Sequence, residues 1–284
     1  MSVLLILNRA FRSIVYVNNK RKFITPNSFY KVSLCLPAFM LLSACGGSSE
    51  DESSGYIRFY NASSDSPGIF MTLDENLDED ADDEFEQTFS SVQYGKVGSR
   101  IQLDTQQYFL ELAWQDEDSS VRSDLEIVYE DQLQIDSDTT HWVVMSDSIQ
   151  NPRVNIFSIP EISDNEAEDD QDGDLFNLRF VNLHASFNDI DVYLSDSDET
   201  FNEAELVTNL QSYALSENYK FEEDQYKIYI TASGSNDVLF TSDEINYAFG
   251  GQYLISVREN QGVGGSPFVI DNISNSSITQ YDAL

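Results

Sequence analysis

Side chains that could act as nucleophiles or as general acids and bases are scarce in this sequence, apart from its carboxylates. The chain holds two histidines, His141 and His184, and two cysteines, Cys35 and Cys45, among 284 residues. The Gly-x-Ser-x-Gly turn that exposes a nucleophilic serine does not occur, nor does a glycine-rich phosphate loop followed by lysine. Each histidine adjoins an expected turn or strand edge, so we expect polar structural roles for both. These residue types favour a protein that is not an enzyme.

The carboxylates are abundant and concentrated in two runs, Asp74–Glu86 and Asp164–Asp174. The second run contains Glu168-x-Asp170-x-Asp172-Gly173, which has the alternating oxygen ligands and the glycine that begin a calcium loop. Position 12 of such a loop should be a glutamate, but it is Arg179, and a strand is expected where a helix should follow. The EF-hand is thereby excluded. A looser calcium site stays open as an alternative, with Asp170, Asp172 and Asp174 as its candidate ligands.

Cys45 has a sequence context that predicts covalent lipid attachment. Residues 1–44 contain six basic residues and no acidic one, and an apolar run from Val32 to Leu42 precedes small residues. A basic region, a short apolar run and small residues form a secretory signal, and this run is too short to span a bilayer. The stretch Leu42-Ser43-Ala44-Cys45 resembles the bacterial lipobox. It predicts a lipoprotein anchored through Cys45, with the outer membrane as its location and a periplasmic or a surface-facing orientation left open.

The charge balance excludes some partners. The whole chain has 15 Lys and Arg against 50 Asp and Glu, a formal net charge of −35. Without residues 1–44, nine basic residues remain against the same 50 acids, a net charge of about −41. Nucleic acid and anionic lipid surfaces are disfavoured because both are bound through clustered cations. Divalent cations, basic partners or simple solubility fit this balance better.

An internal repeat of roughly 100 residues organises the rest of the chain. Ile57-Arg58-Phe59-Tyr60-Asn61 recurs as Leu178-Arg179-Phe180-Val181-Asn182. Further along, His141-Trp142-Val143-Val144-Met145 matches Gln252-Tyr253-Leu254-Ile255-Ser256, and the segment from Pro152 matches the segment from Pro267. A repeat of this length is a whole domain rather than one turn of a solenoid.

Each copy shows the period-two alternation and the turn residues of short strands, which predict an all-β fold. We expect two tandem antiparallel β-sandwich (Ig-like) domains after the lipoprotein signal segment. The only helical signal is at Asn202–Leu210, where about two turns are predicted. The expected organisation is a signal segment (1–44), a flexible tether (45–55), a first sandwich (56–162), an acidic linker (163–174) and a second sandwich (175–284).

The landmarks of the two copies resemble those of a known family. They are an opening Arg-Phe-x-Asn segment, an apolar strand, a Tyr-Gly turn and a late strand that follows a glycine. In the first copy they are Arg58, Phe59, Asn61, Ile69, Leu73, Tyr94-Gly95 and Trp142. In the second they are Arg179, Phe180, Asn182, Ile190, Asp191, Val192, Tyr193, Gly250-Gly251 and Tyr253. This pattern looks like domain-of-unknown-function family 4397. The resemblance implies a secreted or lipid-anchored bacterial β-sandwich, often in two copies, and implies no activity, cofactor or catalytic residue.

Arg58 and Arg179 are the other polar residues of interest, because each lies in an alternating strand of a chain that has few cations. We expect them to pair with acids or to donate to carbonyls at the sandwich edge, with ligand contact as the alternative. The leading interpretation is a non-enzymatic, lipid-anchored envelope module for binding, scaffolding or adhesion, without a cofactor. Its partner would be an unidentified envelope protein or a glycan. Two alternatives stay open, a calcium-dependent adhesion module and a glycan-acting β-sandwich hydrolase.

Overall fold

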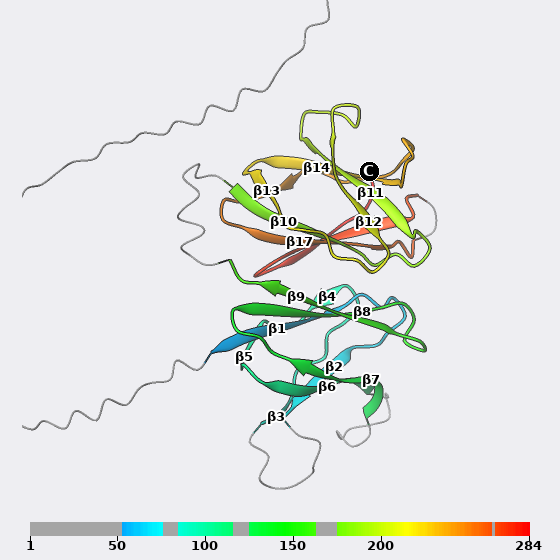
Figure 1. Cartoon of the computed structure of the whole chain (residues 1–284). Helices are drawn as coiled ribbons and strands as arrows, with labels where there is room; N and C mark the ends of the chain where they lie inside the picture. Colours follow the sequence, from blue (N-terminus) through cyan, green and yellow to red (C-terminus); the bar gives the residue numbers. More distant parts are fainter. Residues whose placement is uncertain (1–52, 76–84, 116–124, 163–174, 263–264) are drawn as a thin grey trace, which may run out of the picture. The chain divides into compact units, whose positions relative to one another are not determined.

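Strands, turns and loops make up all of the chain that the structure describes. It is a computed structural model, and it describes residues 53–75, 85–115, 125–162, 175–262 and 265–284 (Figure 1). Over these ranges there is no helix, and so none that has the length and apolar character to cross a membrane. Both copies of the repeat belong to one compact unit, Ser49–Leu284. The predicted all-β fold is confirmed.

Two sheets form the first copy. The outer sheet has the strand order β3-β2-β6-β7, and the inner sheet has the order β4-β1-β8-β9, with β5 paired to β1. Their bounds are β1 Ser54–Asn61, β2 Ile69–Asp74, β3 Glu86–Thr88, β4 Lys96–Val97, β5 Ile101–Asp104, β6 Gln107–Gln115, β7 Leu125–Gln134, β8 Thr139–Ser146 and β9 Arg153–Pro160.

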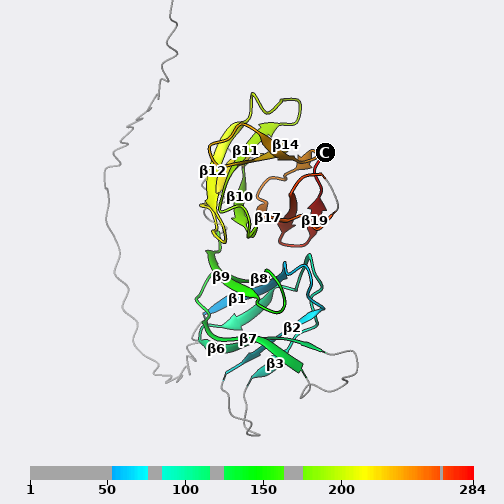
Figure 2. The same cartoon turned by 90° about the vertical axis from the view of Figure 1, so that its right-hand side faces the viewer.

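The second copy repeats this plan. Its inner sheet has the order β13-β10-β17-β18-β19, and its outer sheet has the order β12-β11-β14-β15, with β16 paired to β14. Their bounds are β10 Leu175–Asn182, β11 Asp189–Asp196, β12 Glu205–Gln211, β13 Tyr219–Glu222, β14 Gln225–Ala232, β15 Val238–Thr241, β16 Ile245–Asn246, β17 Gln252–Glu259, β18 Phe268–Ser274 and β19 Ile278–Tyr281. In both views the outer and inner sheets of each copy lie face to face, as in a sandwich (Figures 1 and 2).

Each inner sheet departs from purely antiparallel pairing at one place. The opening strand pairs in parallel with a late strand, β1 with β8 and β10 with β17, whereas every other named pair is antiparallel. A parallel pair needs a long connection between its two strands. In both copies that connection contains the outer sheet, so the parallel pair closes the sandwich around its own core.

Alternating side chains fill a separate core inside each copy. In the second copy Phe176, Leu178 and Phe180 of β10 point into the core and are completely buried. In the first copy Ile57 and Phe59 of β1 do the same. These residues are spaced by two because successive strand side chains point to opposite faces of the sheet.

A third apolar cluster lies between the two inner sheets, so the second face of each inner sheet is also covered. It explains why all eight residues of β8 are buried, since strands that are covered on both faces lose their polar alternation. The buried members of this cluster are Tyr60, Ala62, Trp142 and Val144 of the first copy and Val181, Leu183, Leu254 and Ile273 of the second.

Buried polar contacts accompany this apolar cluster. The Tyr60 hydroxyl donates to Oδ2 of Asp271, and Nε of Arg258 donates to the same oxygen over 2.6 Å. Arg258 also donates to the hydroxyl of Tyr94. Burial and the neighbouring Asp271 raise the pKa of Tyr60 well above its ordinary value, so this phenol stays protonated. Because Tyr60 and Tyr94 belong to the first copy and the other two residues to the second, this network joins the copies.

The two copies share a turn geometry that supports their equivalence. The side-chain oxygen of Asn61 accepts from the backbone N–H of Ser63, and that of Asn182 accepts from the N–H of His184. The backbone carbonyls of these asparagines accept from Gly95 and from Tyr213, which have φ values of +66° and +61°. The Tyr-Gly turn of the first copy therefore corresponds to Tyr213 in the second copy.

The predicted residue-by-residue matching of β8 in the first copy with β17 in the second is wrong by one residue. Asn61 pairs with Met145 and Asn182 pairs with Val257, so Met145 corresponds to Val257 rather than to Ser256. A shift of one residue in a strand moves each side chain to the opposite face, so Trp142 corresponds to Leu254 and not to Tyr253.

The helical prediction at Asn202–Leu210 is also wrong. The segment forms a turn and then β12, which pairs with β11 across a bulge beside Val192 and Tyr193. Pairing with a neighbouring strand outweighs a weak local helical preference. Leu206 remains 56% exposed on this strand, so it does not form the apolar helix face that the spacing suggested.

Candidate functional site

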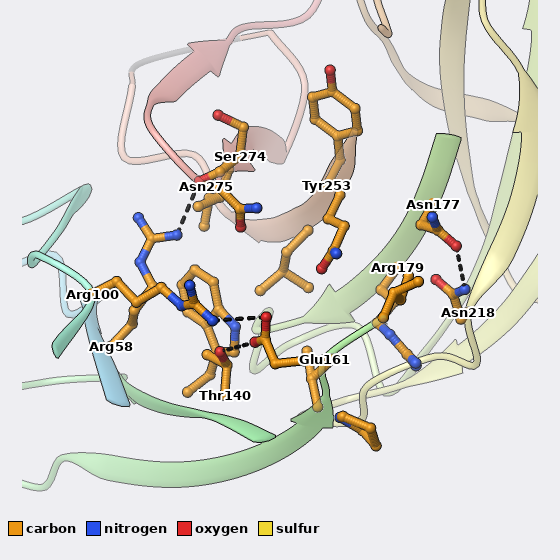
Figure 3. A pocket seen from close by; sticks show the side chains of 17 residues that line it. Arg58, Arg100, Thr140, Glu161, Asn177, Arg179, Asn218, Tyr253, Ser274 and Asn275 are labelled. Carbon is orange, nitrogen blue, oxygen red and sulfur yellow. Dashed lines mark hydrogen bonds and ion pairs between the residues drawn. The ribbon is translucent and has the colours of Figure 1, made fainter. Parts of the chain in front are cut away.

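A cleft that gathers several charged side chains lies at the junction of the two inner sheets, and it is here named the junction cleft. It has a volume of about 50 Å³ and takes its lining from both copies. In Figure 3 the side chains approach it from two sides. Those used below are Arg58, Arg100, Thr140, Trp142, Glu161, Asn177, Arg179, Asn218 and Tyr253.

Arg58 forms one wall of the junction cleft. Its guanidinium lies 4.6 Å from the ring centroid of Trp142, which follows from the register that pairs β1 with β8 at these two residues. Its Nη1 donates to the carbonyl of Ser274 over 3.0 Å, and its Nε is buried without a hydrogen-bond partner in the described structure. Burial, and then the positive charge of Arg100, lower the pKa of Arg58 to about 10. Among the described residues, this buried guanidinium therefore has neither a partner for every N–H group nor a nearby negative charge that offsets the loss of solvent.

Arg100 and Glu161 form an ion pair within the cleft. Nη2 of Arg100 lies 2.7 Å from Oε2 of Glu161, and the Thr140 hydroxyl donates to Oε1 (Figure 3). The Arg100 guanidinium also lies over the ring of Tyr56, 3.3 Å from its centroid. The two charged side chains are 30% and 27% exposed, so solvent reaches this pair. The cleft thus already holds one carboxylate between a guanidinium and a hydroxyl.

The second copy contributes a third guanidinium and a pair of amides. Nη1 of Arg179 donates to the carbonyl of Ser216 over 3.2 Å, and burial lowers the pKa of Arg179. Nδ2 of Asn218 donates to Oδ1 of Asn177 over 2.7 Å, which fixes the orientation of both amides (Figure 3). Since Asn177 and Arg179 alternate with core residues of β10, their side chains share the face opposite the core.

Tyr253 borders the cleft, but its ring points away from the cavity and packs against Phe176 and Tyr247 in the core of the second copy (Figure 3). Its hydroxyl accepts from the backbone N–H of Ala248 over 3.1 Å. Gly251 makes room for the ring, because a Cβ at that position would lie 2.3 Å from Cε2 of Tyr253. The glycine before this strand, which the sequence pattern singled out, therefore has a steric role in the packing of Tyr253.

The junction cleft is locally positive in an acidic chain. Its described lining has three guanidiniums, from Arg58, Arg100 and Arg179, and one carboxylate, from Glu161. The duplication produces part of this charge, since Arg58 and Arg179 are equivalent residues of the two copies. Both donate to carbonyls, as expected, and they also lie together at one cavity, which the sequence did not predict.

A larger cavity of about 360 Å³ opens in the first copy. Apolar side chains such as Phe59, Met71 and Phe89 form its interior, and serines with Lys96 lie at its rim. Its described lining includes none of the buried polar atoms that lack a partner. It offers apolar burial without the converging polar groups that orient a ligand, so the junction cleft is the better candidate site.

The two histidines have structural roles, as expected. Nε2 of His141 accepts from the backbone N–H of Asp136, and Nδ1 lies 3.0 Å from the Ser158 hydroxyl. Nδ1 of His184 accepts from the N–H of Ser186, and Nε2 lies 3.3 Å from the Pro267 carbonyl. Burial lowers the pKa of both residues. Both rings are at most 2% exposed and neutral, and neither lines the junction cleft.

The lipidation and calcium predictions fall on parts of the chain outside the described residues. Leu42, Ser43, Ala44 and Cys45 precede residue 53, and Asp170, Asp172 and Asp174 lie within 163–174. Among the described residues there is no group of three or more acidic, histidine or cysteine side chains that could hold a metal ion. Both predictions stay predictions.

Sequence reasoning missed Arg100, Glu161, Asn177 and Asn218. Arg100 and Glu161 lie outside the repeated landmarks, and Asn218 precedes a short strand in a connecting segment. The one signal in the sequence concerns Arg100, which is one of only nine cations after residue 44. That signal does not reveal which acid or amide lies nearby.

No family model matches the sequence, and no curated protein matches it significantly. Solved structures give weak similarities. A Bacillus anthracis TIE protein matches with 7% identity and a TM-score of 0.24 over 82% of this chain, which spans 49% of that protein. A candidate adhesin from Bacteroides ovatus matches with 10% identity and a TM-score of 0.22, covering 81% of this chain and 96% of that one.

A family-26 carbohydrate-binding module from Eubacterium rectale, in complex with maltoheptaose, matches with 9% identity and a TM-score of 0.21. That match covers 81% of this chain and 97% of the module. Similarities this weak establish neither a shared architecture nor a shared function.

Proposed function

We propose that this chain is a non-enzymatic binding module of the cell envelope, and that the junction cleft is its ligand site. The observation that carries the proposal is the convergence of Arg58, Arg100 and Arg179 on one small cavity that contains a single carboxylate. In a chain with 50 acidic residues, three guanidiniums at one place form an unusual surplus of positive charge. Such a surplus, beside amides and an aromatic ring, is suited to orienting a polar ligand.

The way in which the copies are joined supports a preformed site. The apolar cluster of the inner sheets and the Tyr60–Asp271–Arg258 network hold both walls of the cleft in one arrangement. A preorganised site loses less conformational entropy when it binds its ligand. Binding at the junction would therefore use the duplication directly, because neither copy alone supplies the full lining.

The carboxylate content of the cleft weighs against the hydrolase alternative. A glycosidase of the common types holds two carboxyl groups on either side of the scissile bond. The described lining has only Glu161, and this carboxylate is already engaged by Arg100 and Thr140. One carboxylate in this setting suits ligand recognition better than bond cleavage.

The envelope location in this proposal depends on Cys45. With a lipid on that residue, the protein would be an outer-membrane lipoprotein whose partner is an envelope protein or a glycan. Membership of both copies in domain-of-unknown-function family 4397 is part of the same proposal, and it rests on the Arg-Phe-x-Asn segments and the turn residues quoted above.

Binding to a panel of neutral and acidic oligosaccharides and of peptides tests the proposal. The wild type is compared with Arg179→Gln, which changes a half-buried cleft residue, and with Arg153→Gln. Arg153 is a matched control because its guanidinium lies over Tyr213, 3.9 Å from the ring centroid, and does not line the cleft. We expect at least one ligand of the panel to bind the wild type and Arg153→Gln equally well and to bind Arg179→Gln weakly or not at all. Equal binding by all three proteins, or no binding by any, contradicts the proposal.

A further inference from the structure

We infer that the ligand of the junction cleft is a carboxylate-bearing sugar, and that the Glu161 side chain occupies the place of the ligand carboxylate in the free protein. This inference rests on the proposed function of the cleft. It adds the chemical class of the ligand and an internal competitor for the site.

The first observation is the set of contacts that Glu161 makes. One carboxylate oxygen lies 2.7 Å from Nη2 of Arg100, and the other accepts from the hydroxyl of Thr140. The cleft therefore already contains a working receptor for a carboxylate. Because both charged side chains are partly exposed, their attraction is screened and contributes little to stability. A ligand carboxylate that makes the same contacts could replace Glu161 at small cost.

The second observation is the uncompensated charge beside this pair. Arg58 is only 6% exposed, and its Nε is buried with no hydrogen-bond partner in the described structure. Its charge is also opposed by Arg100, which lowers the pKa of Arg58 further than burial alone. A buried donor without a partner is costly, and charge-assisted hydrogen bonds to a carboxylate are among the strongest that a guanidinium makes. A ligand carboxylate in the cleft would accept from the unpartnered Nε of Arg58 and would offset the repulsion between Arg58 and Arg100.

The third observation favours a sugar over a peptide. Asn177 and Asn218 orient each other through a 2.7 Å hydrogen bond, and Gln252 and Asn275 add two further amides to the lining. An amide both donates and accepts, as does a sugar hydroxyl, so amides are suited to reading hydroxyl groups. A cavity of about 50 Å³ admits only a small part of a ligand, such as a carboxylate and the adjoining atoms of one sugar ring.

Calorimetry with oligogalacturonates and with the same oligosaccharides after methyl esterification tests the inference. Esterification removes the charge and keeps the sugar, so we expect the wild type to bind the acid form at least about tenfold more tightly. In Glu161→Gln the internal competitor has lost its charge. We expect this variant to bind the acid form about threefold to tenfold more tightly than the wild type does, with little change for the ester.

Glu126→Gln is the matched control, because Glu126 is an exposed acid of β7 in the outer sheet of the first copy and does not line the cleft. We expect its affinities to equal those of the wild type. Circular dichroism and the melting temperature verify that each variant is folded. A gain in Glu126→Gln equal to that in Glu161→Gln would assign the effect to net charge and overturn the role of Glu161.

The other outcomes separate this inference from the proposed function. Equal affinity for acid and ester, or binding only of a carboxyl-terminal peptide, overturns the acidic-sugar class while the cleft remains the site if Arg179→Gln still abolishes binding. Weaker acid binding in Glu161→Gln overturns the placeholder role of Glu161. Absence of binding to every member of the panel removes the proposed function and this inference together.

Discussion

The hydroxyl of Tyr60, in β1, donates a hydrogen bond to the carboxylate of Asp271, in β18, and both residues are completely buried. Arg258 donates to the same carboxylate from the neighbouring strand. One buried anion is thereby compensated by a phenol from the first copy and a guanidinium from the second. A buried polar network of this kind must be satisfied in one geometry, because separating its members leaves buried groups unpaired at a high cost in free energy. The relationship therefore defines how the inner sheets meet and, through them, the shape of the junction cleft.

Removing the charge of Asp271 is expected to destabilise the protein strongly. In Asp271→Asn the buried guanidinium of Arg258 loses its counterion, and breaking a buried ion pair on one side costs about 3–5 kcal/mol. Tyr60→Phe removes one donor and keeps the ion pair, so we expect a smaller loss of about 1–3 kcal/mol. Urea denaturation measures both changes as the free energy of unfolding.

Tyr129→Phe is the matched control for these two variants. Its hydroxyl donates to Oδ2 of Asp131 over 3.0 Å in a solvent-exposed hydrogen bond of β7, although its ring is half-buried. We expect a loss below about 0.5 kcal/mol there, because substitutions at exposed sites have small effects. Equal losses in Tyr60→Phe and Tyr129→Phe would show that the contact between the copies adds no stability of its own.

Acid is expected to destabilise the fold through His184. Burial holds the pKa of His184 below its ordinary value of 6.5, and its Nδ1 accepts a backbone hydrogen bond that protonation would break. As pH falls through 6.5 the unfolded chain takes up this proton first, so the free energy of unfolding falls. The stability that neutral His184 contributes is complete above pH 6.5. Below that pH the free energy of unfolding falls progressively, by at most about 1.4 kcal/mol per pH unit for one proton.

His184→Asn isolates this contribution. Asparagine keeps an acceptor and a donor but does not titrate in this range, so the slope of stability against pH below 6.5 should become shallower. The slopes are compared rather than the absolute stabilities, since the variant also loses the edge contacts of the ring with Phe187 and Phe268. Identical slopes in the two proteins would mean that His184 is not held neutral by the fold.

The sequence predicted what depends on local alternation. The Phe176, Leu178 and Phe180 spacing marks β10 and its core face without any further information. The repeated Arg-Phe-x-Asn segments likewise identified β1 and β10 as equivalent strands. Local alternation did not determine the register of the later strands. All residues of β8 are buried, so no alternation of polar and apolar residues shows which side chains face the core of the first copy.

The junction cleft depends on contacts that no local pattern records. Glu161 meets Arg100 across about 60 residues of chain, and Arg58 donates to Ser274, 216 positions away. Acidic residues are so common that Glu161 could not be distinguished from the other carboxylates by type. Only the packing of one inner sheet on the other brings these side chains together, and that packing depends on the shapes of the whole sheets.

Arg58→Met is expected to separate binding from stability. Methionine has a similar length and removes a buried charge whose pKa is lowered to about 10, and replacing such charges by apolar groups is often neutral or stabilising. Water can reach the half-buried Ser274, whose carbonyl loses its donor. We therefore expect stability to change by less than about 1 kcal/mol and oligogalacturonate affinity to fall at least about tenfold. Unchanged affinity would exclude Arg58 from the site.

Gly251→Ala is expected to disturb the cleft sterically. The added methyl would lie 2.3 Å from Cε2 of Tyr253 and 2.8 Å from the backbone carbonyl of Ala248, so the ring must move. Because Gln252 and Leu254, on either side of Tyr253 in β17, line the cleft, we expect weaker ligand binding and a loss of about 1–3 kcal/mol in stability, as for other overpacked sites. Gly234→Ala is the control, since Gly234 has a φ of +72° but no atom within 4 Å of the added Cβ. It should lose about 1–2 kcal/mol through backbone strain and bind normally.

Cys45→Ser is expected to release the protein from membranes. If Cys45 carries two or three acyl chains, the contribution of about 0.8 kcal/mol per buried methylene makes the attachment practically permanent, whereas serine offers no thiol for the lipid. Labelled palmitate should enter the wild type and be absent from Cys45→Ser, and the variant should appear in the soluble fraction. Cys35→Ser is the control, because Cys35 lies within the predicted signal segment and its loss should leave labelling intact. Label retained in Cys45→Ser would contradict the lipobox, and the cleft would then act in a protein held at the envelope by other means or not held there at all.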